Sequence, residues 1–265
     1  MEIAGNLKKM DAILHDKVAY SLKFENEIIP MNKLIGKRIK IKYLHKINCI
    51  KCGSETKTSF AQGFCYPCFI SAPEAEDCVI RPELCRAHEG IARDMVYARE
   101  HCLIDHFVYL ALSGGLKVGV TRYTQIPTRW IDQGAGKAII LARTPNRHIA
   151  GSIEVALKHH LKDKTNWRIM LTRESPGNED LLEEKKRVLA LLHPDFRKYK
   201  EKEDSVTEIS YPVPEYPGQV KSINLDKTDL IDDILTGIKG QYLIFSSGAV
   251  LNIRKHGGYL VELTY

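Results

Sequence analysis

The stretch VYLALSGGLKVGVTRYTQIPTRWIDQGA, residues 108–135, decides how the middle of the chain folds. Two short apolar runs flank the turn sequence SGG, which predicts an antiparallel hairpin. Pro127 and Gly134 then delimit a short helix, because proline is tolerated in the first helical turn and glycine often ends a helix. We therefore predict that the hairpin leads directly into a short helix that carries Arg129.

The next residues extend this pattern to an order of β-β-α-β-α. KAIILAR, residues 137–143, reads as a third strand, and Asn146 is a suitable cap for the helix that follows it. On that helix, Glu154 falls on the same stripe as Ala150 and Leu157. A carboxylate on an apolar stripe is costly unless it is paired or binds a metal. Glu154 is therefore a candidate metal ligand, and an ion pair with Lys158 or with an arginine is the structural alternative.

The cysteines lie between positions 49 and 102 and predict two structural zinc sites. Two C-x2-C pairs separated by twelve residues can close one tetrahedral zinc site, formed by Cys49, Cys52, Cys65 and Cys68. Two disulfides are the alternative, which a reducing compartment disfavours. Four protein ligands leave no coordination position for water, so this site is expected to be structural.

A second zinc site is predicted from the remaining cysteines and one histidine. Its ligands would be Cys78, Cys85, His88 and Cys102, a Cys3His set that suits zinc. His101 and His106 are rival ligands, and three buried free cysteines are the alternative to a metal site.

The chain length and composition allow one large domain or two to three small ones, since 44% of the 265 residues are hydrophobic. We predict an α+β fold whose β-rich ends form one small barrel, with the rest of the chain inserted between them. Five segments are expected: a β-rich N-terminal segment (1–48), a zinc-binding segment (49–105), the β-β-α-β-α core (106–173), a charged helix with a proline-rich linker (174–218) and a β-rich C-terminal segment (219–265).

The positive charge is concentrated in two blocks, which favours a polyanionic partner. Residues 1–48 contain ten Lys or Arg against five acidic residues, and residues 106–173 contain eleven against three. A solvated basic surface without a partner is the alternative. The residues expected to bind nucleic acid, either DNA or RNA, are Lys37, Arg38, Lys40, Lys42, Arg122, Arg143 and Arg147.

The sequence favours a cytoplasmic location and no membrane partner. No apolar run approaches the roughly 18 residues that a membrane span requires, and the N-terminus lacks the apolar stretch of a signal peptide. The sequence leaves the oligomeric state open.

The central segment resembles the GIY-YIG endonuclease superfamily, which has the same β-β-α-β-α order. Tyr109 in VYL matches the first tyrosine of the family, and Gly119 in KVG matches the glycine of its second motif. Arg129, Glu154 and Asn166 match the arginine, the metal-binding glutamate and the downstream asparagine. The likeness covers about 60–70 residues; Lys117 stands where the second tyrosine usually lies, and no histidine follows the arginine in its helix.

The resemblance implies a phosphodiester hydrolase that uses Mg²⁺ or Mn²⁺ bound by Glu154. Arg129 would hold the phosphate, and Asn166 would orient a water or a phosphate oxygen. Tyr109 would act as general base, with Lys117 or Arg122 as the cation that lowers its pKa. The alternative is a non-catalytic nucleic-acid-binding zinc protein that keeps the fold.

The whole chain also resembles the family called domain of unknown function 2797. The phrases GFCYPCF, PELCRAHEGIARD, KVGVTR, RWIDQGA and DKTNWRIML carry this likeness. This resemblance implies no activity of its own.

Overall fold

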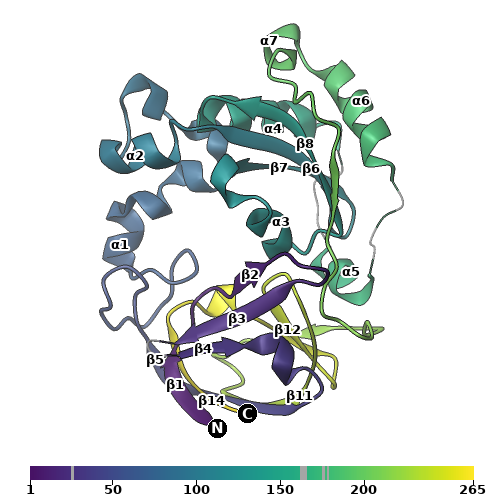
Figure 1. The fold of residues 1–265 in the computed structure, drawn as a ribbon. Helices are drawn as coiled ribbons and strands as arrows, with labels where there is room; N and C mark the ends of the chain where they lie inside the picture. Colours follow the sequence, from purple (N-terminus) through teal and green to yellow (C-terminus); the bar gives the residue numbers. More distant parts are fainter. Residues whose placement is uncertain (25–26, 162–165, 175–176, 178) are drawn as a thin grey trace. The chain divides into compact units, whose positions relative to one another are not determined.

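The protein is described by a computed structural model that covers residues 1–24, 27–161, 166–174, 177 and 179–265. The chain divides into two compact units (Figure 1). The terminal unit comprises Met1–Ile70, Leu171–Glu174 and Ser210–Tyr265, and the central unit comprises Ser71–Met170 and Ser175–Ile209. Both β-rich ends of the chain thus belong to one unit, whereas the predicted zinc-binding segment is shared between the two.

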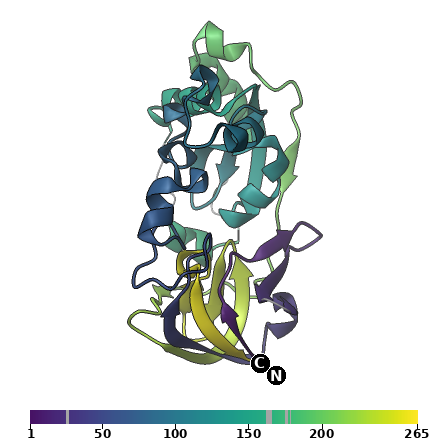
Figure 2. The ribbon, with the colours of Figure 1, turned by 90° about the vertical axis from the view of Figure 1, so that its left-hand side faces the viewer.

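The terminal unit is built on a seven-stranded sheet in the order β1-β14-β5-β11-β12-β13-β10. Strand β5 lies between β14 and β11 and is antiparallel to both. In Figures 1 and 2 the two termini lie side by side, as the antiparallel pairing of β1 with β14 requires. The strands are β1 (Glu2–Asn6), β5 (Arg38–Ile47), β10 (Lys221–Ser222), β11 (Leu230–Lys239), β12 (Tyr242–Phe245), β13 (Ala249–Asn252) and β14 (Tyr259–Thr264).

The prediction that the two β-rich ends pair with each other is confirmed, but the prediction of a closed barrel was wrong. Among the described residues, no pairing joins β1 to β10, so the sheet is open. A bulge between Leu235 and Gly237 divides β11, whose first half pairs with β5 and whose second half pairs with β12. The last strand, β10, has only two residues, so it could form only a short ladder with β1. A second sheet contains β2 (Asp11–Ile13), β3 (Ala19–Phe24) and β4 (Glu27–Pro30).

The central unit contains a four-stranded sheet in the order β7-β6-β8-β9. The chain runs through β6, β7, α3, β8 and α4 in turn, which confirms the predicted element order. Strand β7 forms one edge of the sheet, and Asn146 Oδ1 caps α4 by accepting a hydrogen bond from the Ile149 amide at 3.0 Å. The bounds are β6 (His106–Leu112), β7 (Leu116–Arg122), α3 (Thr128–Asp132), β8 (Lys137–Thr144), α4 (Arg147–Lys158) and β9 (Val206–Glu208).

The core of the central unit forms where two helices pack on this sheet. Val108, Leu110 and Leu112 alternate along β6 and are buried with Ile153 of α4 and Val188 of α6.

The remaining helices of the chain are α1 (Tyr66–Ser71), α2 (Met95–His101), α5 (Trp167–Thr172), α6 (Leu181–Leu191) and α7 (Pro194–Arg197). Within the described parts of the chain, no helix has the length and apolar character needed to cross a bilayer.

A buried histidine in this core predicts a pH-dependent stability. His106 is 1% exposed, its Nδ1 lies 2.8 Å from the Ile104 carbonyl oxygen, and burial lowers its pKa to about 4. Below pH 6.5 the unfolded chain takes up a proton that the folded chain accepts only near pH 4, so stability falls as the pH drops through this window. We expect protonation of this residue to lower the free energy of unfolding by about 2 kcal/mol between pH 7 and pH 5.

Urea unfolding at the two pH values measures this loss. His106→Asn keeps an N–H donor near the Ile104 carbonyl but has no titrating group. The free energy of unfolding of this variant should therefore fall by about 2 kcal/mol less than that of the wild type between pH 7 and pH 5. An equal pH dependence in the wild type and in the variant would contradict the prediction.

Candidate functional site

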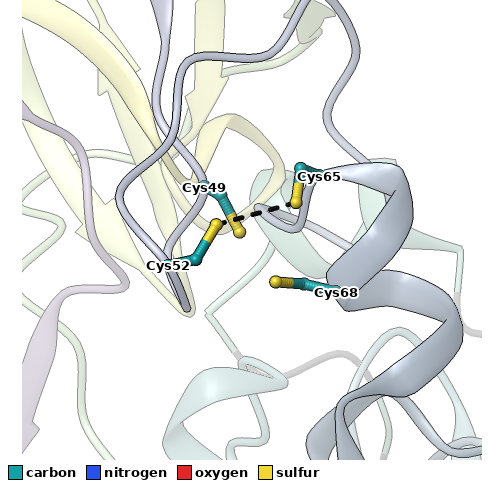
Figure 3. Close-up of side chains that lie close together, drawn as sticks. All are labelled: Cys49, Cys52, Cys65 and Cys68. Atoms are coloured by element: carbon teal, nitrogen blue, oxygen red, sulfur yellow. Dashed lines mark hydrogen bonds between the residues drawn. The ribbon is translucent and has the colours of Figure 1, made fainter.

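The first cysteine group lies in the terminal unit, directly after β5. Cys49 and Cys52 occupy a tight turn, in which Gly53 has a φ of +74° and donates its amide to the Cys49 carbonyl at 2.9 Å. Cys65 and Cys68 lie at the start of α1 and face this turn (Figure 3). The four sulfurs all lie within 4.8 Å of one another.

The spacing of these sulfurs fits zinc. The Sγ atoms of Cys52 and Cys65 are 3.8 Å apart, which is the separation that a tetrahedral site with Zn–S bonds of about 2.3 Å requires. Hydrogen bonds from the Ser54 side chain and backbone lower the pKa of Cys52 to about 6, which favours the thiolate that zinc binds. All seven cysteines are free, so the disulfide alternative does not apply in this structure.

The second cysteine group lies in the central unit and is buried. Cys78 belongs to a short 3-10 turn (Asp77–Val79), Cys85 follows another (Pro82–Leu84), and Cys102 ends α2. Their sulfurs also lie within 4.8 Å of one another. Three converging thiols can hold a zinc ion, so each unit contains one group that fits zinc.

His88 is not a member of this group, contrary to the sequence prediction. The 3-10 turn Ala87–Glu89 buries Ala87, and the His88 ring instead stacks on His148 with ring centroids 4.4 Å apart. The rival ligand His101 stacks on Tyr97 with a centroid separation of 3.8 Å. The other rival, His106, faces the Ile104 carbonyl, so the group in the described residues consists of the three cysteines.

From the sequence, Arg147 was expected to bind nucleic acid. In the structure, Arg147 lies beside the second cysteine group. It is 8% exposed, and its guanidinium donates to Cys78 Sγ at 3.4 Å and to the His101 carbonyl at 3.1 Å. It lies in the first turn of α4, and its amide donates a hydrogen bond to the Cys102 carbonyl at the end of α2 at 2.9 Å. Arg147 therefore offsets negative charge on the thiolates and is not available at the surface.

A cavity of about 210 Å³ in the central unit brings together three of the predicted catalytic residues. Lys117 comes from the edge strand β7, Arg129 from α3 and Glu154 from α4. Its other polar lining residues are Gln133 and Lys158, and its apolar lining residues are Val79, Ile80, Pro82, Val118 and Val120, with Gly119.

The charges in this cavity are three cations and one carboxylate. Glu154 has a side chain that is 11% exposed, and its carboxylate lies 3.6 Å from Lys158 Nζ one helical turn away. The ion pair named as the alternative reading of Glu154 is therefore present. Among the described residues, Arg129 Nε is buried without a hydrogen-bond partner at this site. An arginine donor that is left unpaired beside two lysines favours binding of an anion.

Tyr109 lies behind the cavity and is fully buried. Its hydroxyl donates a hydrogen bond to Gln133 Oε1 at 2.7 Å. Gly119 pairs with Tyr109 across the hairpin, and a Cβ at position 119 would lie 2.6 Å from the hydroxyl, so glycine makes room for the ring.

Burial raises the pKa of Tyr109, although the Arg129 guanidinium beside the hydroxyl opposes this. A protonated Tyr109 that orients Gln133 fits these surroundings better than the general base expected from the sequence. Trp130 is 2% exposed and packs edge-on against Tyr109, as a core residue would.

A family model described as "Protein of unknown function (DUF2797)" matches residues 36–261. The chain belongs to this family. The match spans both cysteine groups and every residue that lines the cavity. No curated protein and no solved structure matches the chain.

In this DUF2797 chain, two further predicted catalytic residues besides Tyr109 do not line the cavity. Asn166 is exposed, and its Oδ1 accepts a hydrogen bond from the Arg168 amide at 3.1 Å at the start of α5. Arg122 pairs with His106 at the far end of β7, three positions from the glycine opposite Tyr109. The cation that acts on Tyr109 is instead Arg129.

The predicted basic strand of the DUF2797 chain carries acidic neighbours as well. Lys40 and Lys42 are exposed on β5 as expected, but they pair across the sheet with Asp232 and Glu262. Arg38 forms an ion pair with Asp232 at 2.8 Å. The exposed face of this strand therefore has mixed charge.

Two further members of the predicted nucleic-acid-binding set are exposed. Lys37 precedes β5 and lies at the surface. Arg143 is exposed on β8 and pairs with Asp105 at 2.5 Å.

Proposed function

We propose that this DUF2797 protein is a zinc-stabilised phosphodiester hydrolase of the GIY-YIG type that acts on nucleic acid with Mg²⁺ or Mn²⁺. The observation that carries the proposal is the cavity in which one carboxylate meets three cations from separate elements. A phosphodiester needs cations around its oxygens, and its hydrolysis needs an activated water. The free cysteines fit a reducing compartment, so we place the activity in the cytoplasm.

Glu154 is the residue proposed to hold the divalent ion. It supplies the carboxylate among the lining residues, and hard cations such as Mg²⁺ and Mn²⁺ prefer oxygen ligands. A bound divalent ion would lower the pKa of a water ligand and offset charge on the phosphate. Lys158, which pairs with Glu154, must release the carboxylate or share it.

The remaining lining residues would bind and orient the phosphodiester. The Arg129 guanidinium lines the cavity and can donate to a phosphate oxygen, and Lys117 adds a second cation from the edge strand. Tyr109 would act as a positioning residue, because its hydroxyl holds Gln133 at the cavity wall.

The second candidate function is a non-catalytic nucleic-acid-binding protein. Two observations favour it: the Glu154 carboxylate already has an ionic partner, and burial raises the pKa of Tyr109. Both readings place an anionic strand in the same cavity, so turnover distinguishes them.

The test is a cleavage and binding assay of the purified protein. Substrates comprise single-stranded, duplex and branched DNA and structured RNA, each with Mg²⁺, with Mn²⁺ and with EDTA. Metal-dependent cleavage of any substrate supports the hydrolase. Binding that weakens with salt, without cleavage, favours the second function. A protein that neither binds nor cleaves any of these substrates would contradict both.

A further inference from the structure

The turn between Cys78 and Cys85 forms an apolar wall of the cavity. Val79 and Ile80 both line it and are unusually accessible for aliphatic residues, at 44% and 79% exposed. Lys117 and Arg129 also line this cavity. The site therefore offers both cationic and apolar groups to a ligand.

This wall is held in place by two kinds of contact. The cysteines at its two ends, Cys78 and Cys85, belong to the second cysteine group. The turn also packs closely on α4 at Gly151, where a Cβ would lie 2.2 Å from the Glu83 amide nitrogen. Glu154 follows one helical turn later, so the wall and the carboxylate are fixed to the same helix.

We propose that Ile80, supported by Val79, contacts the nucleobase next to the phosphate bound by Arg129 and Lys117, and that this contact selects unpaired nucleotides. The inference rests on the proposed function. A nucleotide has an anionic phosphate and a flat, largely apolar base face, and the cavity offers a group of each matching kind. In a duplex the base faces are stacked on their neighbours, whereas an unpaired base exposes them.

The size of the cavity agrees with this substrate class. About 210 Å³ is below the roughly 300–1,000 Å³ of pockets that enclose a drug-sized ligand. Such a cavity can take a phosphate with part of one nucleoside, and not the width of a duplex.

The experiment compares Ile80→Ser with the wild type by fluorescence anisotropy in EDTA, so that no strand is cut. One probe is a labelled thymidine decamer, and the other is a decamer of the same length whose central nucleotides are abasic. The matched control is Ile91→Ser, since Ile91 is 49% exposed in the same unit but does not line the cavity.

We expect Ile80→Ser to bind the thymidine decamer about fivefold more weakly, which corresponds to burial of roughly half an isoleucine side chain. Its binding to the abasic decamer, and all binding by Ile91→Ser, should stay within about twofold of the wild type. Equal losses on both probes, or no loss on either, would overturn the base contact. Wild-type binding to duplexes without binding to the decamer would overturn this inference and leave the proposed function intact. Failure to bind any nucleic acid would overturn the proposed function itself.

Discussion

Glu154→Ala is expected to reduce Mg²⁺- or Mn²⁺-dependent cleavage by about a thousandfold or more. A metal ion that stabilises charge in the transition state contributes several kcal/mol, and each 1.36 kcal/mol changes the rate tenfold. Glu154 is the carboxylate that lines the cavity, so its removal would leave a divalent ion without a charged ligand there. Binding of the strand should be retained, because Arg129, Lys117 and Lys158 remain.

The measurement is the single-turnover cleavage rate on whichever substrate the wild type cuts, together with the affinity for that substrate in EDTA. Mn²⁺ binding by electron paramagnetic resonance gives a readout that does not depend on turnover. Glu184→Ala is the matched control, since Glu184 is a helical glutamate in the same unit that pairs with Arg187. If Glu154→Ala cut as fast as the wild type, the activity would belong to another site or to a contaminant.

Two zinc ions per chain are expected from elemental analysis, and loss of either should unfold the unit that contains its site. Structural zinc supplies about 10–16 kcal/mol in small zinc domains, which is comparable to the whole stability of a typical domain, roughly 5–15 kcal/mol. Cys52→Ser should therefore lower the zinc content to one and abolish cooperative unfolding of the terminal unit. Cys85→Ser should do the same for the central unit.

His88→Ala is the control for the second site. Because His88 stacks on His148 outside the cysteine group, the variant should retain two zinc ions. A loss of one zinc in this variant would restore His88 as a ligand. A wild-type content of one zinc would contradict the assignment of the three-cysteine site, and a content of zero would contradict both sites.

The parts of the fold that the sequence predicted correctly depend on local backbone chemistry. The hairpin turn requires left-handed backbone at Gly114 and Gly115, whose φ values are +69° and +136°. Gly134, with a φ of +66°, ends the short helix, and Asn146 caps the next one. Each C-x2-C pair likewise brings two sulfurs together within four residues, on a tight turn for Cys49 and Cys52 and at the start of α1 for Cys65 and Cys68.

The features that sequence reasoning missed depend on contacts between distant residues. Closure of a barrel depends on strand lengths at both edges, and the two residues of β10 carry no signal of that kind. The direction of the His88 ring follows from which side of a 3-10 turn is buried. The hydrogen bond from Arg147 to Cys78 joins residues 69 positions apart, and no local sequence pattern predicts it.

The pairing of β14 has a consequence for synthesis of the protein on the ribosome. This strand hydrogen-bonds to both β1 and β5, so the sheet of the terminal unit stays incomplete until β14 has been translated. The central unit, which ends at Ile209, leaves the exit tunnel earlier and can fold first. Until β14 has been translated, β1 and one edge of β5 lack their pairing partner. Unpaired strand edges can pair with strands of other chains. Chaperone demand should therefore be highest just before β14 emerges, when β1 and β5 have been longest without this partner.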